Sequence, residues 1–484
     1  MASTFFIKNN GDSAFPKKGH SLATSKRKND EDLGSNSKGR AKKPNSKHNE
    51  EISSESETES TAEQNEREGE DEFDETPQEK KLRLAKVYLD QLREEEEKKA
   101  EQVSFETELV AGRLQEELLE QKGKLQRCIA KDLLAPDASE IRVLRGHQLP
   151  VTCLVISPDE KFIFSGSKDC SIIKWDIETG KKLHTIKGGR KGTEARHGGH
   201  TTQVLCMAIS SDGKYLASGD MNRAIIIWEP DTCKQLYKLK GHRGAVSALS
   251  FRTGSHDLYS GSHDRSVKVW NVDENAYVET LFGHQDAITG LDCLSRERCV
   301  TAGGRDNTVR VWKITEESQL VFHGHGGSID CIQLINEEHM ITGSDDGSVS
   351  VWSVNKKKPL STVKVAHGSF GEAGLEQPHW VASVAALQNS DTVASGASGC
   401  SNNSEVHVWA CGQGFRSLQP LFSVPVPGFI NSLEFSTSGK FLVAGVGQEH
   451  RLGRWWRQKE AKNGIYIIPL KRRSAQQEEP PATE

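Results

Sequence analysis

Between residues 142 and 470, apolar side chains occur in short runs with a two-residue alternation, and turn residues separate the runs. The first stretch of this kind contains four runs, at residues 151–156, 162–164, 172–175 and 183–186. Short alternating runs joined by turns are typical of antiparallel strands in consecutive hairpins. The pattern therefore predicts a unit of four strands that begins near residue 151.

Sequence markers show that this unit is repeated. A Gly-His pair opens five units, and Ala366-His367 opens a weaker sixth; the five histidines are His147, His200, His242, His284 and His325. Each unit ends with a tryptophan: Trp175, Trp228, Trp270, Trp312, Trp352, Trp409 and Trp455 or Trp456. Six residues before the first six tryptophans stand Asp169, Asn222, Asp264, Asp306, Asp346 and Asn403. The steps between tryptophans range from 40 to 57 residues, and the shortest match the roughly 40–45-residue propeller repeat.

These markers resemble those of the WD-repeat family. The resemblance predicts an all-β fold, a seven-bladed WD-repeat β-propeller over residues 141–470,. The run 142–145 has no blade of its own, so we expect it to join blade seven and close the ring, which removes free strand edges,. Residues 464–468 compete for that place.

The repeated polar residues could be mistaken for catalytic machinery. In the WD-repeat family they form a structural network in which aspartate accepts from histidine, histidine reaches serine or threonine, and this hydroxyl reaches tryptophan. The resemblance assigns this role to His147, Ser165, Asp169, Trp175, His242, Ser260, Asp264, Trp270, His284, Asp306, Trp312, His325, Thr342, Asp346 and Trp352. A set copied around a ring indicates a scaffold, and no Gly-x-Ser-x-Gly nucleophile motif is present,. We therefore expect no enzyme activity. The second and sixth blades, which have Asn222 and Asn403 in place of the aspartate, and the seventh, which lacks the motif, should be held less tightly by polar networks.

The region before the repeats divides into two segments. Residues 8–48 contain eleven Lys and Arg against four acids, whereas residues 50–79 contain fourteen acids and one base. Without spaced apolar residues, residues 1–79 are predicted to be a disordered arm, basic and then acidic,. Residues 80–135 follow with apolar residues at three- and four-residue steps, which predicts an amphipathic helical segment over 80–133, broken near 103–105 or at Gly112 and ended by Pro136,. This segment either packs on the next domain or docks a partner.

Several short motifs in the arm and tail have alternative interpretations. The two basic clusters form either a bipartite nuclear-import signal or a solvated tail; they comprise Lys26, Arg27, Lys28, Arg40, Lys42 and Lys43. The Ser/Glu tract at 53–60 is either an acidophilic kinase target or a solubilising stretch. Residues 471–484 are expected to form a disordered tail.

Composition excludes several classes of protein. Apolar residues make up 35% of the 484-residue chain, and no run approaches the ~18 that a membrane helix needs,. The N-terminal apolar patch is too short for a signal peptide. The ten cysteines include no Cys-x-x-Cys pair, which argues against disulfide or zinc modules,. We therefore expect no membrane association, no metal and no cofactor. Residues 136–484 carry a net charge of only +1, so any nucleic-acid site there must be a local patch.

Two segments could provide such a patch. One is the loop at 187–197, and the other is the segment 450–459, where basic residues alternate with glycine and tryptophan. This composition suits phosphate contacts and base stacking, although ordinary loop charge and tryptophans packed in a blade would look the same. If blade seven abuts blade one, the two segments become neighbours on one face. The RNA-binding candidates are Lys187, Arg190, Lys191, Arg196, His450, Arg451 and Arg454.

Beyond the repeat markers, residues 144–168, 204–220, 263–279, 285–287, 316–322 and 445–456 resemble a family of U3 small nucleolar ribonucleoprotein WD-repeat proteins. The resemblance covers about residues 80–470. It implies a nuclear, nucleolar component of the box C/D ribonucleoprotein that binds the B/C box region of U3 small nucleolar RNA together with a small RNA-binding core protein. It also implies membership of the small-subunit processome, which processes pre-ribosomal RNA towards 18S RNA and the 40S subunit.

The alternative is a substrate adaptor or scaffold of a ubiquitin ligase or chromatin complex. Such adaptors often carry Trp-Asp-x-Arg at a blade end, and the corresponding stretches, 175–178 and 270–273, lack the arginine.

Overall fold

The computed structural model describes residues 77–99, 107–190, 192–193, 197–371, 376–398 and 404–473. The arm up to residue 76, with its basic clusters and Ser/Glu tract, lies outside the described part, and so do residues 474–484 of the predicted tail.

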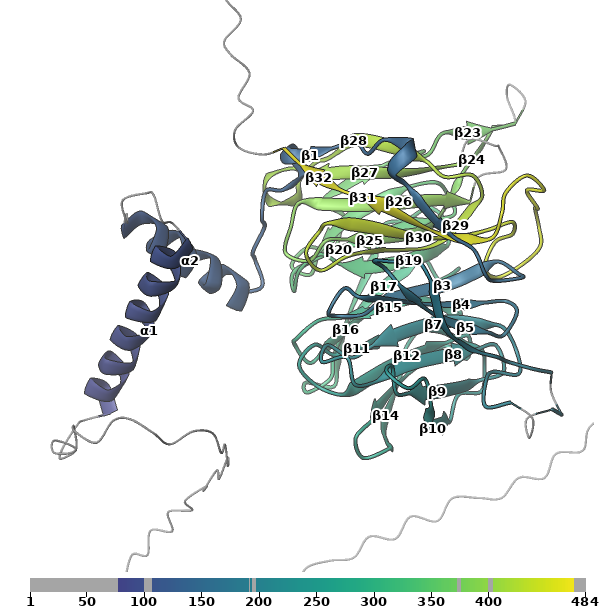
Figure 1. Cartoon of the computed structure of the whole chain (residues 1–484), viewed down its shortest axis with the longest axis horizontal. Helices are drawn as coiled ribbons and strands as arrows, with labels where there is room; N and C mark the ends of the chain where they lie inside the picture. The colour runs from purple at the N-terminus through teal and green to yellow at the C-terminus, as the bar shows by residue number, and fades with distance from the viewer. Residues whose placement is uncertain are drawn as a thin grey trace, which may run out of the picture. The chain divides into compact units, whose positions relative to one another are not determined.

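Two helices precede the strands (Figure 1). α1 (Pro77–Lys99) begins shortly before the predicted boundary at residue 80, and α2 (Thr107–Gln121) contains Gly112 without a break. The Tyr88 hydroxyl of α1 donates a hydrogen bond of 2.6 Å to Glu117 Oε2 of α2. Neither described helix is long and apolar enough to cross a bilayer.

The prediction that the helix continues to Pro136 is wrong, because α2 ends at Gln121. Gly123 has a φ of +70°, and its N–H bonds the carbonyl of Glu120 while the Lys124 N–H bonds that of Leu119. This pair of bonds is the Schellman cap, which favours glycine at the left-handed position. The apolar residues after it, Leu125 and Ile129, therefore lie outside the α-helix, in a connecting segment that includes a 3₁₀ turn.

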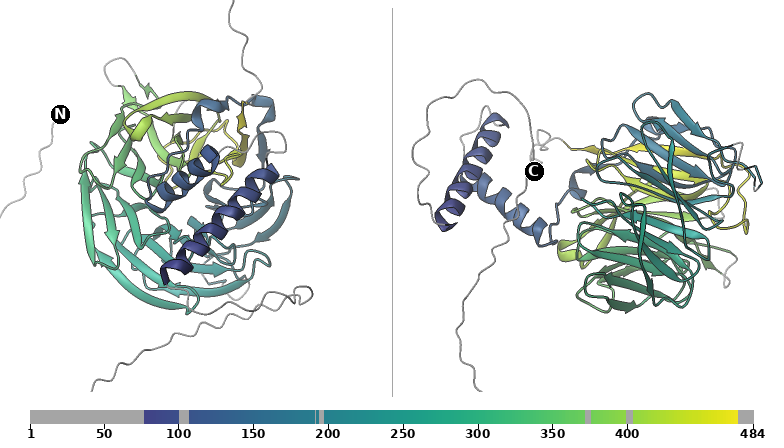
Figure 2. Two further views of the ribbon diagram at one scale, coloured as in Figure 1. Left: turned by 90° about the vertical axis from the view of Figure 1, so that its left-hand side faces the viewer. Right: turned by 90° about the horizontal axis from the view of Figure 1, so that it is seen from below.

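Seven four-stranded antiparallel sheets form the blades of a β-propeller, which confirms the predicted fold class (Figure 2, left). Blades one to three consist of β3 (Val151–Ile156), β4 (Phe162–Ser167), β5 (Ile172–Asp176), β6 (Lys182–Ile186); β7 (Val204–Ile209), β8 (Leu216–Asp220), β9 (Ala224–Trp228), β10 (Gln235–Lys240); and β11 (Val246–Phe251), β12 (Asp257–Ser262), β13 (Ser266–Asn271), β14 (Ala276–Phe282). Blades four to six consist of β15 (Ile288–Cys293), β16 (Arg298–Gly303), β17 (Thr308–Lys313), β18 (Ser318–His323); β19 (Ile329–Leu334), β20 (His339–Ser344), β21 (Val349–Ser353), β22 (Ser361–Val363); and β25 (Trp380–Ala386), β26 (Thr392–Ser398), β27 (Glu405–Cys411), β28 (Leu418–Pro425).

Burial decreases from the centre of the ring outwards. In blade one, every residue of the inner strand β3 is buried, whereas most of the outer strand β6 is exposed. Apolar clusters fill the spaces between neighbouring blades; one of them joins Val155 of β3 to Met207 of β7. This gradient explains why the inner strands read as continuous apolar runs and the outer strands as alternating ones.

Blade seven combines the two ends of the repeat region. It contains β29 (Phe429–Phe435), β30 (Phe441–Gly447), β31 (Gly464–Pro469) and, on the outside, β2 (Arg142–Leu144). Val143 of β2 pairs with Tyr466 of β31. The expectation that residues 142–145 close the ring is confirmed, and the competing run 464–468 lies beside them as the third strand.

The seventh repeat has no tryptophan in its third strand, contrary to the sequence prediction. Ile468 of β31 pairs with Leu442, as Trp175 pairs with Ile163 in blade one. Trp455 and Trp456 lie instead in the connection between β30 and β31, residues 448–463, which we call the insertion. The connections from a second to a third strand, and from one blade to the next, share one face of a propeller. The insertion therefore lies on the same face as the β6–β7 loop and the small ribbon of β23 (Ser369–Phe370) and β24 (Gln377–Pro378) (Figure 1).

On the opposite face, residues 122–134 run as a strap over blades five and six. The strap includes the 3₁₀ turn Ala130–Asp132 and β1 (Leu133–Leu134); a second 3₁₀ turn, Ala138–Glu140, follows it, and a third, Gln413–Phe415, lies in blade six. The Asp391 carboxylate accepts the N–H groups of Ile129 and Ala130 at 2.8 and 2.9 Å. β1 pairs with β32 (Lys471–Arg472), so these two residues of the predicted disordered tail are part of the fold.

Candidate nucleic-acid interface

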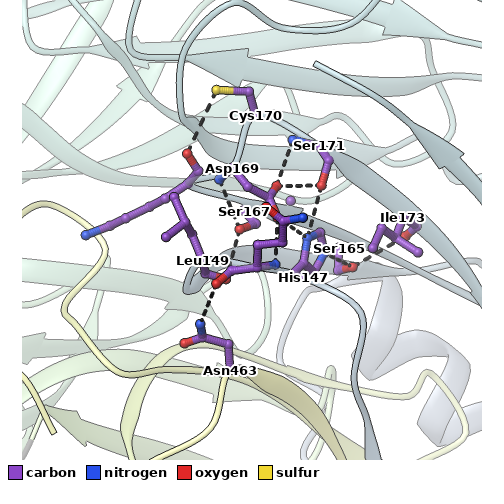
Figure 3. A network of polar contacts seen from close by, with 12 residues as sticks. His147, Leu149, Ser165, Ser167, Asp169, Cys170, Ser171, Ile173 and Asn463 are labelled. Atoms are coloured by element: carbon purple, nitrogen blue, oxygen red, sulfur yellow. Dashed lines mark hydrogen bonds and ion pairs between the residues drawn. The ribbon is translucent and has the colours of Figure 1, made fainter. Parts of the chain in front are cut away.

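The polar network of blade one brings the predicted residues together (Figure 3). The Ser165 hydroxyl lies 2.8 Å from His147 Nε2. It also accepts the Trp175 indole N–H at 2.8 Å. His147 Nδ1 lies 3.3 Å from Asp169 Oδ2. Because a carboxylate only accepts, Nδ1 carries the proton and Nε2 accepts from the serine. The hydroxyl is fully buried between these two rings, where a substrate would not reach it.

The same arrangement recurs in blades three and four. In blade three, His242 lies 3.0 Å from Asp264 and 2.8 Å from Ser260, which also accepts the Trp270 N–H at 2.8 Å. In blade four, Thr301 takes the place of the serine. Its hydroxyl lies 2.7 Å from His284 Nε2 and accepts the Trp312 N–H at 2.8 Å, and His284 Nδ1 lies 2.7 Å from Asp306.

Blade two is more complete than its sequence suggested. Asn222 does not substitute for the aspartate, because Asp220, two residues earlier, lies 3.0 Å from His200 Nδ1. Ser218 bridges His200 and Trp228 at 2.6 and 2.7 Å. The expectation of a weaker polar network in blade two is therefore wrong.

Blades five and six use shortened networks. In blade five, Thr342 bridges His325 and Trp352, while His325 Nδ1 lies 3.1 Å from Ser348. The Asp346 carboxylate instead accepts the Ser348 N–H at 2.8 Å. In blade six, Ser395 contacts His367 and Trp409, both at 2.8 Å, and Asn403 lies outside the described residues.

Electrostatics agree with a structural role for these networks. Burial alone would raise the pKa of Asp306, but the hydrogen bonds from His284 and Thr308 outweigh burial and lower it to about 2. Burial lowers the pKa of His325 to about 4, so this ring is neutral. Among the described residues there is also no cluster of His, Cys, Asp and Glu that could hold a metal ion.

The sequence predicts that Arg451 lies on the surface beside the residues of the β6–β7 loop, and this prediction is wrong. Its side chain enters the central channel, where the guanidinium donates to the carbonyls of Asp330 and Thr289 at 2.7 and 3.2 Å. A cavity of about 150 Å³ surrounds it, lined by inner strands of the ring. The backbone N–H of Arg451 is also held, at 2.9 Å, by Asn431 Oδ1. This arginine ties blade seven to blades four and five.

His450 is also placed in the interior. Its side chain is buried, and burial, followed by the positive charges of Arg451 and Lys168, lowers its pKa to about 3. A neutral, enclosed imidazole cannot contact phosphate, so His450 is removed from the RNA-binding candidates.

An ion pair below the surface anchors the insertion to blade one. Lys168 Nζ donates to the His450 carbonyl at 2.6 Å and lies 3.6 Å from the Glu449 carboxylate, both side chains being nearly buried. Glu449 also accepts from Arg454 at 2.9 Å and lies 4.0 Å from Arg457. The two arginine side chains are 72% and 60% exposed, and Arg457 also donates to Gln448 Oε1 at 3.0 Å.

On the β6–β7 loop, Lys187 and Arg190 are exposed. Lys191 and Arg196 lie outside the described residues. Of the seven candidates, Lys187, Arg190 and Arg454 are thus placed as exposed cations on one face.

Sequence reasoning missed an aromatic cluster on that face. Trp380, at the start of β25, lies between Trp456 and Trp455, with ring centroids 4.9 and 6.0 Å away. Phe370 of β23 contacts Trp456 at 6.0 Å, and His450 contacts Trp455 at 5.5 Å. Trp380 is not one of the tryptophans that end the repeats, and this departure from the pattern could have indicated that it has a different role.

Comparisons with known proteins support the fold and the family. The family model described as "WD domain, G-beta repeat" matches residues 138–176, 192–229, 233–271, 275–313 and 316–353. A solved structure described as U3-55K superposes with a TM-score of 0.67 and 65% sequence identity, and the match covers 69% of this chain and all of that one.

Two relatives are also informative. U3 small nucleolar RNA-interacting protein 2 of Mus musculus is 68% identical over 399 residues, which cover 82% of this chain and 83% of the mouse protein. Ribosomal RNA-processing protein 9 of Saccharomyces cerevisiae is 29% identical over an alignment that covers 82% of this chain and 90% of the yeast protein. At the identity and coverage of the mouse protein, the chain belongs to the family of U3 small nucleolar RNA-interacting protein 2.

Proposed function

We propose that this chain is a non-catalytic component of the U3 small nucleolar ribonucleoprotein that acts in the processing of pre-ribosomal RNA. The observation that carries the proposal is the 68% identity to a U3 small nucleolar RNA-interacting protein over most of both chains. The name of the yeast relative adds ribosomal RNA processing. The networks of histidine, Ser or Thr and tryptophan support a scaffold rather than an enzyme, because their hydroxyl groups are fully buried and the arrangement is repeated around the ring.

The finer parts of the proposal concern partners and location. The chain binds the B/C box region of U3 RNA together with a small RNA-binding core protein, within the small-subunit processome and in the nucleolus. Import through the clusters at 26–28 and 40–43 accounts for its entry into the nucleus. Retained nuclear accumulation of a variant lacking residues 8–48 would contradict the import signal.

The proposed RNA face is the one that carries the insertion. Lys187, Arg190 and Arg454 are exposed there, and Arg457 adds a fourth cation. Around the insertion, three cations (Lys168, Arg454 and Arg457) share one carboxylate, Glu449. This local excess of positive charge suits phosphate, although residues 136–484 are nearly neutral as a whole,.

Crosslinking of the full chain in cells, followed by sequencing of the bound RNA, tests the proposal. We expect U3 RNA to be enriched, with crosslinks at the B/C box region. A variant with Arg190, Arg454 and Arg457 changed to Gln should lose most of this enrichment while folding normally. Enrichment of unrelated RNAs alone, or of none, would overturn the proposed function.

A further inference from the structure

Trp455 differs from the other tryptophans of the propeller. The six tryptophans that end the repeats are at most 5% exposed, whereas Trp455 is 58% exposed. A large aromatic ring left in solvent costs hydrophobic free energy that burial would recover, so such a ring often marks an interaction site.

The exposed ring is held in a fixed position. Gly453 lies directly against one side of the indole, since a Cβ at this residue would meet ring atoms at 3.0 Å. The rings of Trp380 and His450 contact Trp455 with centroids 6.0 and 5.5 Å away. The Gly453 carbonyl itself lies 3.4 Å from Lys168 Nζ. Because this support already orders the ring, little conformational entropy remains to be lost on binding.

The charges beside the ring select the kind of partner. Arg454 and Arg457, next to the two tryptophans in sequence, both pair with Glu449, and the buried Lys168 shares the same carboxylate. Both guanidinium groups keep most of their surface in solvent. A flat aromatic ring beside a surplus of arginine is the combination that binds single-stranded nucleic acid, through base stacking and phosphate contacts.

A base-paired helix would not use this surface in the same way. In a duplex, both faces of each base are covered by its neighbours, whereas loops, bulges and single strands expose them. Trp455 has Gly453 on one side and remains 58% exposed, so the exposed part of its ring can accept such an unstacked base.

Resting on the proposed function, we propose that Trp455 is a stacking platform for an unpaired base of the bound RNA, with Arg454 and Arg457 holding the flanking phosphates. This face would then bind single-stranded RNA elements, such as an internal loop or a junction, in preference to a continuous RNA helix.

The test compares full-length chains that carry Trp455→Ala, Trp455→Phe or Phe282→Ala. Phe282 is a matched control because it is 73% exposed and ends the outer strand of blade three. The probes are U3 RNA, a single-stranded uridine 12-mer and a blunt RNA duplex of equal length. We expect Trp455→Ala to weaken binding to U3 RNA and to the 12-mer by about 5- to 150-fold. Trp455→Phe and the control should bind nearly as the native chain does, and duplex binding should not change.

Salt dependence separates stacking from phosphate contact. Trp455→Ala should keep the native slope of log affinity against log salt, whereas Arg454→Gln should reduce it by about 0.7. Equal affinity of Trp455→Ala and the native chain for U3 RNA would overturn the platform and leave the proposed function standing. If the native chain fails to bind U3 RNA even when the small RNA-binding core protein is present, the proposed function fails. Loss of particle proteins with unchanged RNA affinity would show that this face binds protein.

Discussion

At the scale of single residues, one buried hydroxyl in each of blades one to six holds a histidine and a tryptophan in place. In blade three, the Ser260 hydroxyl accepts a hydrogen bond from the Trp270 indole and also bonds His242 Nε2. His242 Nδ1 in turn bonds the Asp264 carboxylate. Hydrogen bonds from His242 and Ser266 hold the pKa of Asp264 well below its usual range, although burial alone would raise it. The residue types of a catalytic triad are thus used to satisfy one another inside a scaffold.

His242→Ala should lower the free energy of unfolding by about 1–3 kcal/mol, because it leaves buried polar groups without a partner. Urea unfolding followed by circular dichroism measures this. The control is His184→Ala, at an exposed position of β6, which should stay within about 0.5 kcal/mol,. Native stability with lost RNA binding would mean that His242 serves recognition instead.

A second histidine makes stability depend on pH. His256 Nδ1 lies 2.6 Å from Asp273, and Nε2 lies 2.8 Å from Asp212. Tyr215 also donates to Asp273, and Lys214 pairs with Asp212. Burial would lower the pKa of His256, but the two carboxylate hydrogen bonds outweigh it and raise the pKa above 6.5.

Since the folded pKa is raised, the stabilisation from His256 is fully present below about pH 6.5 and is lost as pH rises through the folded value. His256→Gln should therefore remove part of the decline in stability between about pH 6 and pH 9. Urea unfolding across this range tests the expectation, and a variant whose stability falls as steeply as that of the native chain would refute it.

At the scale of elements, the strap shows how a glycine can redirect an apolar pattern. Gly123 caps α2, and a Cβ there would also meet Glu337 Cβ at 2.5 Å. Leu133 and Leu134, after this point, therefore lie in the short strand β1 instead of a helix. Leu133 joins the apolar core of blades six and seven, while its neighbour Leu134 is 40% exposed.

Leu133→Ala should destabilise the propeller by about 2–5 kcal/mol, as truncation of a buried leucine does. Leu134→Ala is the matched control, from the same strand, and should change stability little. Thermal unfolding of both variants measures the difference. Equal stabilities would show that the strap contributes nothing to the fold.

At the scale of the whole molecule, blade seven is joined to distant parts of the ring by its insertion. Arg451 bonds carbonyls of blades four and five across the channel, and Lys168 of blade one holds Glu449 and the His450 carbonyl. The polar tetrad of the other blades is absent from blade seven, and these long-range contacts stabilise it instead.

Arg451→Ala should lower stability by about 1–3 kcal/mol, because two channel carbonyls lose their donor. Arg190→Ala, at an exposed loop position, should change stability by less than about 0.5 kcal/mol and weaken RNA binding instead. Denaturation and RNA titration of both variants distinguish the roles. Full stability of Arg451→Ala with a reduced salt slope would return Arg451 to the RNA surface.

The local and repeated features of this protein could be predicted from its amino-acid sequence. The spacing of His, Asp and Trp specified six blades, and the number seven was correct although Trp455 and Trp456 lie outside the third strand of the last blade. The sequence also predicted that residues 142–145 close the ring, because each blade depends mainly on its own residues and its neighbours,.

The directions of the insertion side chains depend on long-range contacts and could not be predicted from the sequence. Arg451, Arg454 and Trp455 are close in sequence and similar in pattern, yet they end in the channel, beside Glu449 and in solvent. The same is true of the contact between His200 and Asp220, where the sequence pattern had pointed to Asn222, and of the path of the strap over blades five and six. These side-chain directions and the path of the strap depend on contacts with residues far away in the sequence or on the exact twist of a strand. Local periodicity in the sequence contains no information about either.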